Sequence, residues 1–68
     1  MIEEGMRIGR YLIVRDVDGR FHALSAAAVL AVCDDSCGGS MMLLPGGRAV
    51  RLDQSIETVL TWLNHSGP

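Results

Sequence analysis

Three glycine-containing turn signals divide this chain into short apolar runs. They are Asp18-Gly19, Gly38-Gly39 and Pro45-Gly46-Gly47. Glycine reaches the positive φ angles that tight turns require, and Asp-Gly between strand-like residues is typical of a type I′ hairpin turn. The runs beside these turns either alternate between apolar and polar residues or are apolar on both faces, and both patterns are typical of strands. The spacing therefore predicts a sheet built from antiparallel hairpins.

The strands follow from the same pattern. Residues 10–17 are apolar on both faces, which predicts a central strand, or one covered on both sides, and the chain is expected to return in a second strand over residues 20–24. Residues 25–28, Ser-Ala-Ala-Ala, allow a short helical turn, and a longer helix over 25–33 is the alternative. The remaining strands are expected at 29–33, 40–44 and 48–52.

The C-terminal part predicts one amphipathic helix over residues 54–64. Asp53 is the expected N-cap and Glu57 suits the first turn. The apolar face is expected to consist of Ile56, Val59, Leu60 and Leu63, which are spaced at i, i+3, i+4 and i+7.

Together these elements define an α+β fold in a single domain spanning residues 1–68. Its core is expected to be a four- to five-stranded antiparallel sheet, curled and barrel-like, with the C-terminal helix packed on it. Residues 1–9 show no period and predict a flexible arm or an edge strand.

The outline resembles the small FlbD-type proteins of flagellar operons. The resemblance rests on the Val-Asp-Gly-Arg-Phe segment at 17–21, the apolar strand and glycine turn at 43–50, and the closing helix at 53–63. It covers roughly residues 10–64. It implies a curled antiparallel sheet with a terminal helix, and the chain departs from the family pattern at 34–39.

Size and charge limit the function. A chain of 68 residues that is 49% hydrophobic has a marginal core of its own, which favours self-association as a homodimer. A net charge of −2 argues against non-specific nucleic-acid binding, because such binding needs a basic face. No signal peptide is recognisable, and the longest apolar run, 26–33, is too short for a membrane span of about 20 residues. We therefore expect a cytoplasmic protein.

Cys33 and Cys37 are the first candidates for chemistry. As a disulfide they would close a five-residue loop and add about 2 kcal/mol to the stability of the fold. Because the cytoplasm is reducing, such a bond would form only as a redox switch, which is one hypothesis. Zinc would need two more ligands, and His22 and His65 are the only histidines. The default interpretation is the tip of a hairpin with one buried cysteine.

The sequence contains no catalytic motif, and no metal or cofactor site is expected. We expect a non-catalytic regulatory or adaptor protein that binds another protein, a class that includes inhibitors encoded by phages and mobile elements. Trp62 and Met41 are the expected apolar contacts, and Arg48 and Arg51 the expected polar ones. The alternative for Trp62 is a tryptophan at the rim of the core that keeps its indole N–H in water. The alternative functions are a nucleic-acid-binding module that uses the strand arginines and a Cys33/Cys37 switch.

Overall fold

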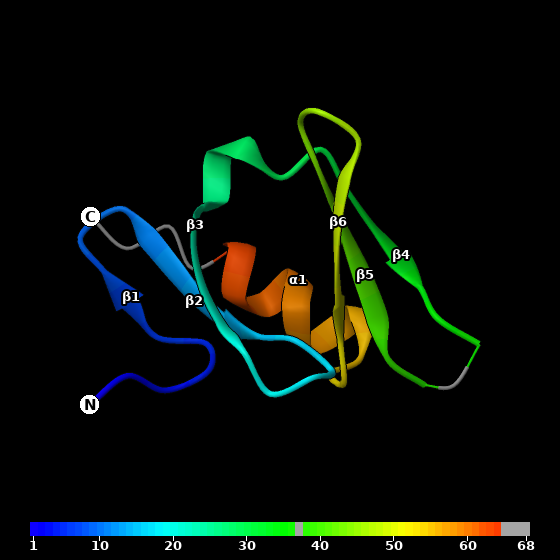
Figure 1. The fold of residues 1–68 in the computed structure, drawn as a ribbon, viewed down its shortest axis with the longest axis horizontal. Helices are drawn as coiled ribbons and strands as arrows, with labels where there is room; N and C mark the ends of the chain where they lie inside the picture. Colours follow the sequence, from blue (N-terminus) through cyan, green and yellow to red (C-terminus); the bar gives the residue numbers. More distant parts are fainter. Residues whose placement is uncertain (37, 65–68) are drawn as a thin grey trace.

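The computed structural model describes residues 1–36 and 38–64, which form short strands, one 3-10 turn and one helix (Figure 1). The strands are β1 (Arg7–Ile8), β2 (Tyr11–Arg15), β3 (Phe21–Ser25), β4 (Ala31–Asp34), β5 (Ser40–Leu44) and β6 (Arg48–Leu52). The 3-10 turn η1 covers Ala26–Ala28, and helix α1 covers Ile56–Asn64. The α+β class, the antiparallel pairing and the single C-terminal helix are confirmed.

The strands form two separate sheets, with the orders β1-β2-β3 and β4-β5-β6. The prediction of one curled, barrel-like sheet of four or five strands is therefore wrong. After β3, η1 turns the chain away, so that β4 pairs with β5 and not with β3. The sheets are linked by one bridge between Asp16 and Leu52, where the Val17 N–H donates to the Arg51 carbonyl at 2.9 Å.

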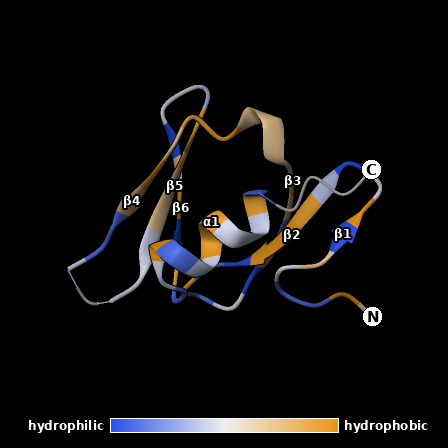
Figure 2. Cartoon of the chain, turned by 180° about the vertical axis from the view of Figure 1, so that it is seen from behind, coloured by the Kyte–Doolittle hydropathy of each residue, from blue (hydrophilic) through white to orange (hydrophobic). Residues whose placement is uncertain are grey.

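The first sheet includes part of the segment expected as an arm or edge strand. Arg7 and Ile8 form β1 at the edge of the sheet, opposite Leu12 and Tyr11. The central position of β2 is confirmed, and Figure 2 shows hydrophobic residues following one another along it. Strand β4 begins two residues later than expected, at Ala31.

The β2–β3 turn differs from the type I′ turn that Asp18-Gly19 predicts. Gly19 has a φ of +86°, but no non-glycine residue in the described part of the chain has a positive φ. The Gly19 N–H donates to the Asp16 carbonyl, and the Asp16 N–H donates to the Arg20 carbonyl, both at 2.9 Å. This is a three-residue hairpin loop in which a type I turn ends in a glycine bulge. The prediction of a turn at Asp18-Gly19 is therefore confirmed, whereas the predicted type of turn is wrong.

Helix α1 begins later than expected because Ser55, and not Asp53, caps it. Ser55 Oγ accepts the Thr58 N–H at 3.2 Å, the hydrogen bond that defines a side-chain N-cap. The apolar face is also rotated from the one predicted. Val59 is fully buried, whereas Leu60 is 48% exposed and Trp62 packs against the core in its place.

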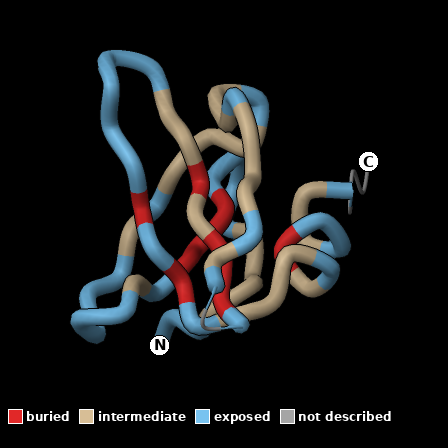
Figure 3. The backbone as a smooth tube through the Cα atoms, turned by 90° about the vertical axis from the view of Figure 1, so that its right-hand side faces the viewer, coloured by how far each residue is buried: buried red, intermediate tan, exposed pale blue. Residues whose placement is uncertain are grey.

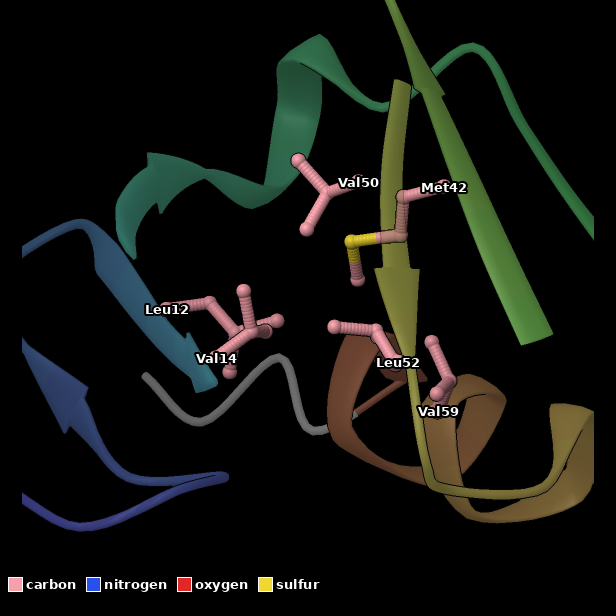
Figure 4. Packing of buried hydrophobic residues seen from close by; sticks show 6 residues of the cluster. All are labelled: Leu12, Val14, Met42, Val50, Leu52 and Val59. Atoms are coloured by element: carbon pink, nitrogen blue, oxygen red, sulfur yellow. The ribbon is translucent and has the colours of Figure 1, made fainter. Parts of the chain in front are cut away.

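The core lies where α1 meets the inner faces of both sheets. Figure 3 shows the buried positions gathered on the strands and on one turn of the helix, and Figure 4 shows their side chains converging. The cluster consists of Leu12, Val14, Met42, Val50, Leu52 and Val59. No helix within residues 1–36 and 38–64 is long and apolar enough to cross a membrane.

Candidate functional site

A hollow in the described part of the molecule lies between the two sheets. Strands β3 and β6 meet near the Asp16–Leu52 bridge and diverge from it (Figure 1). The space that opens is a cavity of about 370 Å³, which we call the inter-sheet groove. Its lining includes His22, Ala23 and Leu24 of β3 and, from the second sheet, Leu44, Arg48 and Val50. A smaller hollow of about 320 Å³, lined in part by Ala49, continues it toward the bridge, and we count it as part of the inter-sheet groove.

Strand β3 turns unused main-chain groups toward this groove. The Ile13 N–H donates to the Met6 carbonyl at 3.0 Å, and the Ile13 carbonyl accepts the Gly5 N–H at 2.8 Å. The main chain of Ile13 therefore faces the β1 side, and the residues flanking it in β2 bond to β3. Ile13 is paired with Ala23 in β3, so the N–H and C=O of Ala23 face away from β2. They face the groove, which Ala23 lines.

Strand β6 does the same from the opposite side. The Arg51 carbonyl accepts a hydrogen bond from Val17 and thus points away from β5. Alternation along an antiparallel strand gives Ala49 the same direction, whereas Val50 bonds to β5. Ala49 is exposed and lines the hollow next to the bridge. The open edges of β3 and β6 are therefore both directed into the space between the two sheets.

The carboxylate nearest the groove is already satisfied within the hairpin. His22 Nε2 donates to Asp16 Oδ2 at 2.7 Å, and Asp16 Oδ1 accepts the N–H groups of Asp18 and Arg20 at 2.9 and 3.0 Å. The hydrogen bond from His22, followed by that from the Arg20 N–H, lowers the pKa of Asp16 below its usual value. Asp16 thus holds the turn and does not offer its charge to a ligand.

The two predicted arginines have different environments. Arg48 is exposed, lines the groove and forms no hydrogen bond or ion pair with any residue that the structure describes. Arg51 Nη2 contacts Asp35 Oδ2 at 2.9 Å. Because residues alternate along β6, Arg48 shares the face of Val50 and Leu52, and Arg51 lies on the other face. Only Arg48 presents an uncommitted guanidinium to the groove.

The outer face of the second sheet brings three other predicted residues together. Met41 is paired with both Cys33 and Arg51 in the register, so their side chains lie on the same face. Cys33 is a half-buried free thiol. Cys37 and His65 lie outside the described residues, and so does the disulfide that was one hypothesis for the two cysteines. Within 1–36 and 38–64, no group of three or more His, Cys, Asp or Glu side chains could hold a metal ion.

Trp62 lies away from the groove and has an internal role. Its indole packs against the core cluster, and a Cβ built on Gly5 would approach Trp62 Nε1 to 2.6 Å. Arg7 Nη2 donates to the carbonyls of Trp62 and Leu63 at 3.0 and 3.4 Å, at the helix end where a cation is favourable. Neither Gly5 nor Arg7 could be identified from the sequence, because each contacts residues more than fifty positions away.

Comparisons with protein-family models, with curated proteins and with solved structures give no match. The resemblance to FlbD-type proteins stays a prediction.

Proposed function

We propose that this protein is a small non-catalytic adaptor that binds a protein partner through the inter-sheet groove. The observation that carries the proposal is the pair of open strand edges, at Ala23 and at Ala49, directed into the two adjoining hollows of the groove. Unpaired strand edges favour pairing with another polypeptide, because their N–H and C=O groups seek hydrogen-bond partners. A regulatory protein or inhibitor that captures one segment of its target would work in this way.

The groove also has the side chains of a binding site. Leu24, Leu44 and Val50 give it an apolar floor that adjoins the core. Arg48 adds one uncommitted positive charge at its wall. Apolar linings with a few polar groups are typical of binding sites, and arginine is enriched in protein interfaces.

Site-specific photo-crosslinking tests this proposal. A benzophenone amino acid is placed at Ala23, which lines the groove, and in a matched variant at Glu57, which is exposed on α1. We expect a protein from the native host to be captured at Ala23 and not at Glu57, with capture reduced by Arg48→Gln. Equal capture at both positions, or none at Ala23, would contradict the proposal.

A second candidate function is supported by the outer face of the first sheet. Tyr11 and Phe21 are 41% and 44% exposed there, and the register places them on the same face as Arg15. The Arg10 guanidinium lies 5.6 Å from the centre of the Tyr11 ring. Exposed aromatic rings beside arginines can stack the bases of single-stranded nucleic acid. Fluorescence anisotropy with labelled oligo-dT at low salt tests this: binding lost in Tyr11→Ala would support it, and a flat titration would exclude it.

The remaining proposals concern assembly and redox state. A homodimer in the cytoplasm is one, and size-exclusion chromatography with light scattering tests its stoichiometry. A redox or zinc switch at Cys33 and Cys37 is the other. Its test is thermal unfolding with reductant, with chelator, and in the double variant Cys33→Ser/Cys37→Ser, and unchanged stability in all three would dismiss it.

A further inference from the structure

Building on the proposed function, we infer that the groove takes an extended peptide segment, added as a strand between β3 and β6, with an acidic side chain for Arg48. Three features of the described residues support this binding mode: the direction of the main-chain groups, the course of the two strands and the distribution of charge.

The main-chain groups define an extended occupant. The N–H and C=O of Ala23 enter the groove from one side and those of Ala49 from the other. An extended strand presents such groups alternately to its two sides, so one segment can bond to both edges at once. A helix satisfies its own main chain and would leave both edges unpaired.

The course of the strands fixes the type of sheet that would result. Strand β3 leaves the Asp16–Leu52 bridge along the chain, whereas β6 runs toward that bridge (Figure 1). The two edges are therefore antiparallel to one another, and an inserted strand is antiparallel to one and parallel to the other. Insertion begins beyond the bridge, because directly paired strands lie only about 4.8 Å apart. The completed structure would be one continuous mixed sheet.

The side chains of the groove determine the composition of the segment. Alternate residues of an inserted strand point to one face, so two or more of them can contact Leu24, Leu44 and Val50. Arg48 lies on the same face of β6 as Val50. An acidic residue next to the apolar ones would pair with its guanidinium. The nearby carboxylate of Asp16 is held by His22 and does not compete for this arginine.

Selection from a random decapeptide library displayed on phage tests the inference on the full chain. Displayed peptides have no free C-terminal carboxylate, so any acid that is selected is a side chain. The key variant is Ala49→Pro, which removes an N–H directed into the groove and leaves the β5–β6 ladder without a lost bond. Arg48→Gln tests the charge, and Arg15→Gln is its matched control on an exposed strand position.

We expect enriched sequences in which Asp or Glu accompanies alternating β-branched or aromatic residues. Loss of one charge-assisted hydrogen bond in Arg48→Gln should weaken the best synthetic peptide about tenfold. Arg15→Gln should have no effect, and Ala49→Pro should weaken binding as strongly as Arg48→Gln. N-methylation of alternate amides in the peptide should also weaken it, which tests strand pairing without altering the protein.

Two results would overturn the inference. One is a peptide that binds Ala49→Pro and the N-methylated series as well as the parent pair, since main-chain pairing would then be absent. The other is no enrichment of acidic extended peptides while a partner still crosslinks at Ala23. In that case the groove binds a protein in another way and the proposed function survives. Failure of both the selection and the crosslink would refute the proposed function itself.

Discussion

Replacing Gly5 by alanine tests how the N-terminal segment is fastened to helix α1. Gly5 has a φ of +88°, and its N–H bonds to the Ile13 carbonyl. An added Cβ would lie 2.6 Å from Trp62 Nε1 and 2.7 Å from Trp62 Cε2. Both the backbone conformation and the contact therefore oppose a side chain at this position.

The two contributions can be separated with Gly9→Ala. Gly9 also has a positive φ, +59°, but a Cβ there would meet nothing within 4 Å. A left-handed conformation costs an alanine about 1–2 kcal/mol, so this loss is expected for Gly9→Ala. The contact with the indole adds about 1–3 kcal/mol at Gly5, as overpacking does elsewhere. We expect Gly5→Ala to lose about 2–5 kcal/mol in total.

Denaturant unfolding followed by fluorescence of Trp62, the single tryptophan, measures both variants. A domain of this length is expected to have a free energy of unfolding of about 3–10 kcal/mol, so Gly5→Ala approaches the limit of folding. Each kcal/mol corresponds to about 4–8 °C in the melting temperature. Equal losses in the two variants would refute the reasoning, because Trp62 would then not be packed under Gly5.

Three further predictions concern the helix and the hairpin turn. Ser55→Ala should cost about 1 kcal/mol as the loss of an N-cap, and Asp53→Ala, at the position wrongly expected to cap, should stay within about 0.5 kcal/mol in urea unfolding. Val59→Ala removes buried methyl groups and should cost about 1.5–3 kcal/mol, whereas exposed Leu60→Ala should stay within about 0.5 kcal/mol. Because the pKa of Asp16 is lowered in the folded state, its contribution to stability is present above the ordinary value of 3.8 and is lost as the pH falls through the folded pKa. Asp16→Asn should therefore make thermal stability less dependent on pH in the acid range, and an unchanged acid profile would count against the hydrogen bonds assigned to that carboxylate.

The local features of the fold could be predicted from the sequence, and its long-range pairing could not. The central strand β2 and the terminal helix follow from periodicity and from glycine positions, and the short turn at Ala26–Ala28 follows from the helix propensity of three alanines after a serine. The division into two sheets depends on where the chain goes after η1, which periodicity does not encode. The two-residue strand β1 is too short to give a pattern, and it exists because Arg7 and Ile8 meet β2.

The candidate site was predicted only in part. Arg48 was among the expected binding residues and lines the groove, because it follows a glycine turn at the start of β6. Trp62 and Met41 were expected to contact a partner because they are apolar residues beyond those needed for the core. Trp62 instead packs against Gly5 and the core cluster. Ala23 and Ala49 could not have been chosen, because their contribution is the direction of their main-chain groups. That direction follows from the register of pairing and not from residue type.

Amide hydrogen exchange of the free protein, followed residue by residue by NMR, tests the central claim most directly. The claim is that β3 and β6 present open edges to the inter-sheet groove. The N–H groups of Ala23 and Ala49 should exchange at rates near those of an unstructured peptide. Their neighbours Leu24 and Val50, which bond to β2 and β5, should be strongly protected. Equal protection of all four amides would contradict the account, because the edges would then already be paired.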